Sequence, residues 1–172
     1  MSIQEKIYVA YDAANDHDFY EQMQEWVQSD ETPFNFINGY EFAKQIDKVN
    51  DDVLKAKIFE RMNESSVCVL LIGKATKSFR RFVKWQIEYA INSGKPIIAI
   101  NINGIRSVDY DRCPTILKKN LSIHIASQAP ILEYALLNWP ASHQKHCEQE
   151  KKFTCRYSND VYDELNLETY DL

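Results

Sequence analysis

Short apolar runs alternate with amphipathic segments along most of the chain. Four of these runs are rich in β-branched or aromatic residues and stop at polar positions: residues 7–11, 34–37, 66–73 and 97–102. The third, Ser-Val-Cys-Val-Leu-Leu-Ile-Gly, is apolar almost throughout, as expected of a central strand that is covered on both faces. We therefore expect four buried strands at these positions.

The segments between the runs place their apolar residues at helical spacing. We expect helices over residues 18–28, 53–62 and 82–92, a short helical piece over 115–119, an edge strand over 122–126 and a final helix over 130–137. Asn15 and Asp16 stand where they could cap the first helix. Strands and helices thus alternate.

This alternation predicts a doubly wound α/β fold, with a parallel sheet of about five strands and helices on both faces. The chain has 172 residues, enough for one core, and we expect a single α/β domain over residues 1–140. Residues 141–172 are strongly polar. They form either a peripheral helix plus a strand near residues 153–157, or a mobile tail.

Ligands of such folds bind beyond the carboxyl ends of the strands. The residues at or just after these ends are therefore the candidate ligand-binding residues: Tyr11 and Asp12, Asn38, Lys74, and Phe82 at the start of the next helix. We expect them to converge on one cleft.

Charge and hydropathy exclude several classes of partner. The formal net charge of −5 disfavours nucleic acid as the main partner. No apolar run approaches the ~20 residues of a membrane span, and the first residues do not have the pattern of a signal peptide. We expect a cytoplasmic protein that binds neither nucleic acid nor membrane.

Sequence motifs for metals and common cofactors are missing. The four glycines are isolated, which argues against a Rossmann fingerprint or a Walker loop. His143, His146, Cys147 and Cys155 do not have the spacing of a zinc site. We expect no metal and no resident cofactor, and we interpret the four cysteines as reduced thiols.

Four segments together resemble the TIR-like family in order and spacing. They are Tyr-Val-Ala-Tyr-Asp at residues 8–12, the strand segment at 65–74, Phe-Val-Lys-Trp-Gln-Ile-Glu at 82–88, and Gly-Lys-Pro-Ile-Ile at 94–98. The resemblance covers roughly residues 6–130. More narrowly, the chain resembles the bacterial and archaeal branch that includes the TIR subunit of the Thoeris antiviral system.

The resemblance implies cleavage of the nicotinamide glycosidic bond of NAD, or synthesis of a cyclic ADP-ribose signal, by a Glu that contacts the ribose hydroxyls. In this chain the corresponding residue is Gln86. Phe82 stands where the family usually has Trp, and Ala10 where Ser is common. Loss of the charge at position 86 should raise the barrier by about 3 kcal/mol, roughly a hundredfold in rate.

Three functions remain open at this point. The first is an NAD glycohydrolase or ADP-ribosyl cyclase in antiviral defence, with NAD as substrate and Gln86 at the catalytic position. The second is a non-catalytic TIR-like module that binds a nucleotide and signals by assembly with itself or with another signalling protein. The third is an unrelated flavodoxin-like or nucleoside-transferring α/β protein, since one fold serves many functions.

Overall fold

The fold is a doubly wound α/β domain built on one parallel sheet. It was obtained as a computed structural model, which describes residues 5–26, 34–38, 48, 50–78 and 81–168. The strands are β1 (Glu5–Ala10), β2 (Phe34–Asn38), β3 (Val67–Ile72), β4 (Ile97–Asn101), β5 (Ser122–Ala126) and β6 (Thr154–Arg156). Their order in the sheet is β2-β1-β3-β4-β5-β6, and every neighbouring pair is parallel. The predicted fold class is confirmed, with six strands where about five were expected.

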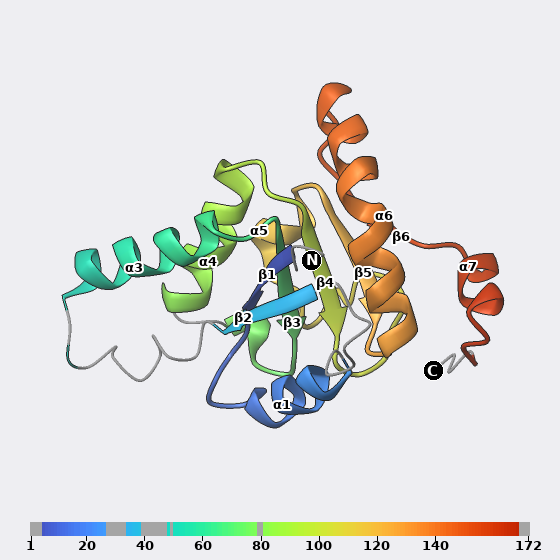
Figure 1. Cartoon of the computed structure of the whole chain (residues 1–172), viewed down its shortest axis with the longest axis horizontal. Helices are drawn as coiled ribbons and strands as arrows, with labels where there is room; N and C mark the ends of the chain where they lie inside the picture. The colour runs from blue at the N-terminus through green and yellow to red at the C-terminus, as the bar shows by residue number, and fades with distance from the viewer. Residues whose placement is uncertain (1–4, 27–33, 39–47, 49, 79–80, 169–172) are drawn as a thin grey trace.

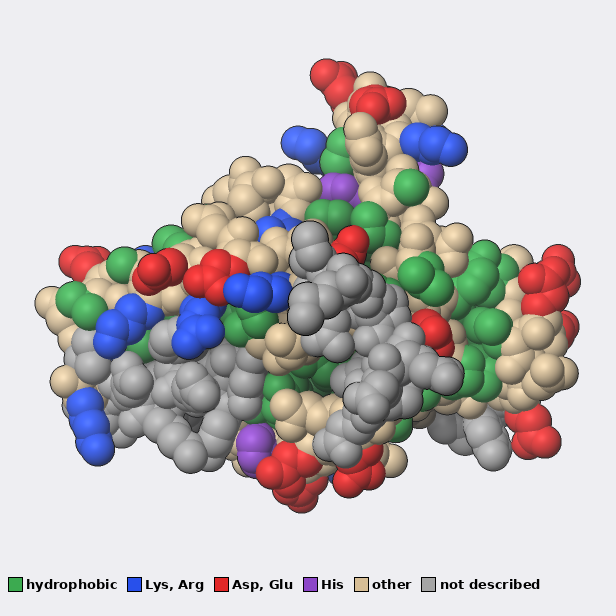
Figure 2. All heavy atoms as spheres, in the orientation of Figure 1, with side chains coloured by type: hydrophobic (Ala, Val, Ile, Leu, Met, Phe, Trp, Pro, Cys, Tyr) green, Lys and Arg blue, Asp and Glu red, His purple; other side chains and the backbone are tan. Residues whose placement is uncertain are grey.

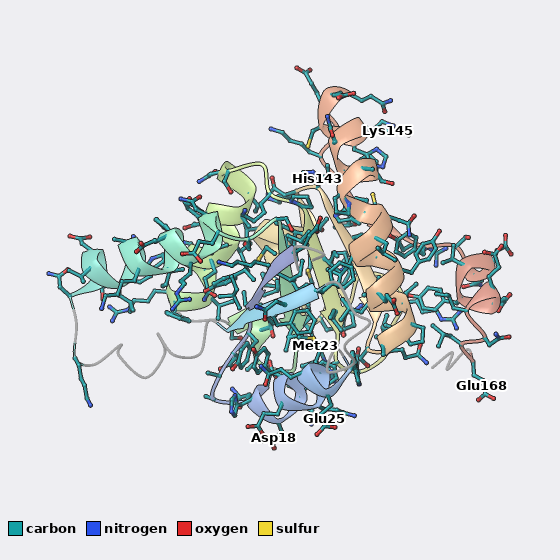
Figure 3. All side chains as sticks on the ribbon, viewed as in Figure 1. Asp18, Met23, Glu25, His143, Lys145 and Glu168 are labelled. Carbon is teal, nitrogen blue, oxygen red and sulfur yellow. The ribbon has the colours of Figure 1, made fainter. Side chains whose placement is uncertain are left out.

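Helices cover both faces of this sheet (Figure 1). They are α1 (His17–Glu25), α3 (Asp51–Asn63), the 3₁₀ turn η1 (Thr76–Ser78), α4 (Arg81–Asn92), α5 (Thr115–Lys118), α6 (Ala129–Glu148) and α7 (Asn159–Glu164). One core cluster joins the sheet to α1 and α6, and the other joins it to α3, α4 and α5. In Figure 3, Met23 of α1 points to the sheet while Asp18 and Glu25 point away from it.

Strand β1 divides its side chains between these two layers. Ile7 and Val9 belong to the core cluster under α1 and α6, whereas Tyr8 and Ala10 belong to the cluster under α3 and α4. This follows from the two-residue period of a strand, in which successive side chains point to opposite faces. Candidate site residues can therefore contact each other only if their side chains lie on the same face of the sheet.

Two of the sequence expectations were wrong. Strand β5 is not an edge strand, because it pairs with β4 on one side and with β6 on the other. Its polar side chains, Ser122 and His124, are both fully buried and lie 3.2 Å apart between Oγ and Nε2. The last helix does not end at residue 137: α6 continues through Pro140 to Glu148, and α7 follows it.

The polar extension takes the first of the two forms expected for it. Helix α6 crosses residue 140 without a break, and β6 then pairs in parallel with β5. Tyr162 of α7 is fully buried in the core cluster under α1 and α6. The division of the chain at residue 140 stays a prediction.

Candidate functional site

The carboxyl ends of β2, β1 and β3 lie side by side at one edge of the sheet. The register pairs Val9 with Asn38 and Ala10 with Leu70. The chain leaves β1 toward β2 on one side and returns to β3 on the other, so the strand order reverses here. Such a reversal is where doubly wound folds bind ligands.

Three of the expected residues lie at or just after the ends of these strands. Asn38 is the last residue of β2, and its side chain lies outside the described part of the chain. Lys74 is exposed in the turn after β3. Asp12 shapes the turn after β1, because its carboxylate accepts hydrogen bonds from Ala14 N (3.1 Å) and from Asn15 Nδ2 (2.7 Å).

Tyr11 lies on the α1 side of the sheet. Its ring stacks on Tyr20 with centroids 4.7 Å apart, and its hydroxyl is 3.0 Å from His17 Nδ1. It is buried in the same cluster as Ile7 and Val9.

Gln86 lies on the other side, in the first half of α4, and is fully buried. Tyr8 donates its hydroxyl hydrogen to Gln86 Oε1 (2.8 Å), and Gln86 Nε2 donates to the carbonyl oxygen of Phe82 (3.0 Å). Both ends of the amide are therefore satisfied inside the domain.

The structure thus brings Gln86 and Phe82 together but places Tyr11 in a different layer. The expectation of one cleft around all these residues did not account for the side of the sheet on which each residue lies. Tyr8, which sequence reasoning passed over as a core residue, is the residue of β1 that contacts Gln86. Its position one residue from Ile7, and thus on the opposite face of the strand, was the available signal.

A buried carboxylate at the same edge was also missed. Asp16 occupies the N-cap position of α1, but its side chain makes no capping hydrogen bond and is only 7% exposed. Burial, reinforced by the nearby Asp12 charge and opposed by Arg112, raises the pKa of Asp16 to about 6. Among the described residues, nothing hydrogen-bonds to its Oδ2 atom.

Gly73 makes room for this carboxylate at the end of β3. A Cβ atom at position 73 would lie 2.2 Å from Asp16 Oδ1, far closer than two such atoms can approach. The side chain of Thr76 fixes the backbone there, since its Oγ1 accepts a hydrogen bond from Gly73 N (2.8 Å). A glycine after an apolar strand was the sequence signal, but its partner could not be read from spacing.

The loop after β4 completes the edge. The buried Asn101 side chain donates from Nδ2 to the carbonyl oxygens of Ile105 and Ser107, each at 2.7 Å. The Asp109 carboxylate accepts from the backbone N of Arg112 (3.1 Å), which fixes the residue whose charge acts on Asp16. Neither residue was anticipated: Asn101 is a single polar residue at the end of a predicted apolar strand, and Asp109 is an isolated polar residue in a loop, so neither has a recognisable spacing.

The edge therefore contains a buried carboxyl group whose Oδ2 atom has no hydrogen-bond partner among the described residues, together with the charge of Arg112 and the backbone of the loop after β4. These groups suit a ligand that carries hydroxyls and a negative charge, because carboxylates accept from hydroxyls and Arg binds phosphate. Among the described residues, no three His, Cys, Asp or Glu side chains are grouped as a metal would require. None of the described helices has the length and apolar composition needed to cross a membrane.

Comparisons with known proteins cover the strand ends and Asp16 at this edge, whereas Asp109 and Arg112 lie just beyond the matched region. Residues 8–107 match the family described as "Thoeris protein ThsB, TIR-like domain". A solved structure, "Crystal structure of conserved protein from Enterococcus faecalis V583", is similar at 16% identity over 95% of this chain and 98% of that one, with a TM-score of 0.46. No match was found among curated proteins.

Proposed function

The chain belongs to the family of the Thoeris protein ThsB TIR-like domain, and on this premise we propose that it binds NAD or an ADP-ribose-type nucleotide at the carboxyl edge of its sheet. Gln86 keeps cleavage of the bound nucleotide slow. The proposed setting is antiviral nucleotide signalling in the cytoplasm.

The observation that carries the proposal is the bonding of Gln86. The resemblance places a catalytic Glu at this position, where a negative charge would stabilise the oxocarbenium-like transition state of glycosidic cleavage. An amide that donates to Phe82 O and accepts from Tyr8 carries no charge and is held in the core. The domain therefore keeps the family architecture without its electrostatic stabiliser.

Asp16 is the carboxyl group that we assign to ligand binding. Its buried Oδ2 atom has no hydrogen-bond partner among the described residues, so a ligand hydroxyl brought to it would satisfy an unpaired acceptor, and the Arg112 charge nearby suits a phosphate. Replacing the carboxylate with an amide removes a charged acceptor, which is worth about 1.5–3 kcal/mol in a hydrogen bond.

Titration calorimetry with ADP-ribose tests the binding proposal. We expect the wild-type chain to bind and the Asp16→Asn form to bind about tenfold more weakly, as a loss of about 1.4 kcal/mol implies. The matched control is Asp18→Asn, an exposed carboxylate on the same helix, which should bind like the wild type. Absence of ADP-ribose and NAD binding by the wild-type chain would remove the proposal.

A second function, signalling by assembly without turnover, is favoured by the same buried amide. A domain that binds a nucleotide but cleaves it slowly can pass on a signal only through its bound state. Light scattering with and without ADP-ribose separates assembly from slow cleavage. Signalling by assembly predicts that a larger species forms when the nucleotide is added, while no cleavage product accumulates. A mass that stays unchanged with ligand bound excludes it.

A further inference from the structure

A hollow lies at the amino edge of the sheet, opposite the candidate site. It has a volume of about 760 Å³ and is bounded by the end of α4, the start of β4, the segment before β5 and the end of α6. Ile97 and Leu121 lie at its floor near the first residues of β4 and β5, and His143 and Cys147 line it from α6. A volume of this size suits a small organic ligand.

A thiol and an imidazole meet on the wall of this hollow. His143 and Cys147 are four residues apart on α6, so they share one helix face, and the Cys147 Sγ atom lies 3.7 Å from the ring nitrogens of His143. The His143 side chain is only 6% exposed, whereas Cys147 is exposed. Burial, and then the neighbouring His146, lower the pKa of His143. At neutral pH it is therefore an uncharged base that can take the proton of the thiol.

Basic side chains surround the pair. Two residues after the end of α6, Glu150 adopts the left-handed conformation (φ 54°), and Lys151 N then donates a hydrogen bond back to His146 O (3.0 Å). This reversal brings Lys151 and Lys152 to the hollow, which Lys95 lines from the α4 side. Figure 2 shows basic and histidine side chains gathered on the part of α6 that projects from the body, with acidic ones at its tip.

The balance of charge in the hollow is positive. Three lysines line it against the single carboxylate of Glu150. The carboxyl end of a helix carries partial negative charge, which disfavours a thiolate, and cations close to that end offset it. The Lys95 ammonium donates to Ser65 O, whereas the Lys151 ammonium has only a cation–π contact with Phe153 at 5.9 Å, so the lysines after α6 are better placed to meet an anionic ligand.

The other three cysteines are poor nucleophiles by contrast. Cys68 and Cys113 are buried, and burial raises the pKa of each thiol to about 12. Burial also raises the pKa of Cys155, which lies on β6. Reactivity follows the exposed thiolate, so Cys147 is the thiol that the fold leaves open to reagents.

We propose that Cys147 is a modification site that takes up the thiol half of an anionic low-molecular-weight disulfide, with the added group lying in the hollow beside Lys151 and Lys152. His143 accepts the Cys147 proton, the thiolate attacks one sulfur of the disulfide, and a new S–S bond forms as the old one breaks. The leaving thiolate takes the proton from the imidazolium and departs as a thiol. One disulfide is consumed and one is formed.

Intact-mass spectrometry with oxidised glutathione, an anionic disulfide, tests the site against cystamine, a cationic one. We expect one adduct per chain, which should be absent in Cys147→Ser. The rate of adduct formation with each disulfide is divided by the rate of that disulfide with a small uncharged thiol. After this correction, the rate with oxidised glutathione should be at least about fivefold above that with cystamine. In the Lys151→Gln/Lys152→Gln form this preference should disappear. Lys145→Gln is the matched control, because Lys145 and His143 lie on opposite sides of α6 in Figure 3.

The role of His143 is tested by the pH profile of iodoacetamide labelling. At neutral pH the wild-type rate should exceed that of His143→Gln by about tenfold, as expected of a general base. The two rates should converge as the pH falls and the imidazole takes up a proton. An adduct spread over other cysteines, a charge preference that survives in the double-lysine form, or equal rates at all pH values would each overturn the proposal.

Discussion

The carboxyl group of Asp16 is buried at a cost to stability. Its pKa is about 6 in the folded chain, against an ordinary value of 3.8 for a solvated Asp, so the folded state binds more protons between these values. The sign follows from linkage: the cost is absent below pH 3.8 and is complete above pH 6. A shift of one pKa unit corresponds to about 1.4 kcal/mol, so the cost in folding free energy reaches up to about 3 kcal/mol at pH 7.5. Such a cost is typical of a functional residue.

Replacing Asp16 with Asn should therefore stabilise the chain at neutral pH. We expect the free energy of unfolding to rise by about 1–2 kcal/mol at pH 7.5 and to change little at pH 4, because the amide has no charge to bury. Urea titrations at the two pH values measure it, with Asp18→Asn as the control. Equal destabilisation at both pH values would show that the carboxylate is structural.

His124 supplies the opposite pH dependence. Burial lowers its pKa to about 4 from 6.5, so its contribution to stability is present above pH 6.5 and is lost as the pH falls toward 4. In the wild-type chain Asp16 offsets part of this loss, since its own cost disappears over much of the same range. The Asp16→Asn form should consequently lose stability more steeply between pH 6.5 and 4 than the wild type, which the same titrations at intermediate pH would reveal.

A substitution at Gly73 tests whether the end of β3 contacts the Asp16 carboxylate at the start of α1. In Gly73→Ala the new Cβ would collide with Asp16 Oδ1, so the carboxylate must move. We expect a loss of about 1–3 kcal/mol in stability, as for other overpacked sites. In a double-mutant cycle, Asp16→Ala should relieve most of that loss. Additive effects of the two substitutions would contradict the contact.

At the scale of elements, the extension after α6 is fixed to the sheet by a few specific contacts. Tyr162 of α7 accepts a hydrogen bond from Ala126 N at the end of β5 (3.1 Å), and the Arg106 guanidinium lies 3.9 Å above its ring centre. Arg106 also donates to the carbonyl oxygens of Leu167 and Glu168. The carboxyl edge and the last helix are thereby connected.

Removing the Tyr162 hydroxyl should be measurable in stability. Tyr162→Phe leaves the buried Ala126 N–H without its acceptor, which costs about 1–3 kcal/mol. Tyr110→Phe serves as control, since Tyr110 is 70% exposed. Thermal melts of the two variants give the comparison. An unchanged melting temperature for Tyr162→Phe would mean that α7 is not held by this bond.

The elements that could be predicted are those with strong apolar runs. The run at 66–73 became β3 in the middle of the sheet because every residue from Val67 to Ile72 is buried. Strand β5 was expected at an edge, but β6 covers its second side, and its polar residues Ser122 and His124 lie within hydrogen-bonding distance of each other in the core. Strand β6 has only three residues, too few to show a period of its own.

At the scale of the whole molecule, the candidate residues chosen from the sequence lie at strand ends and helix starts but on two different faces of the sheet. Strand-end positions alone could not show that Tyr11 packs under α1 while Tyr8 reaches Gln86. Asp16 was considered only as a possible helix cap, because its contact with Gly73, 57 positions away in the chain, is formed only by folding.

Release of nicotinamide from NAD by the wild-type chain and by Gln86→Glu is the most direct measurement, with thermal melts to confirm that both forms are folded. The account predicts that the Glu form releases nicotinamide about a hundredfold faster than the wild type, since the restored charge is worth about 3 kcal/mol. Turnover by the wild type as fast as by the Glu form, or no release by either folded form, would contradict it.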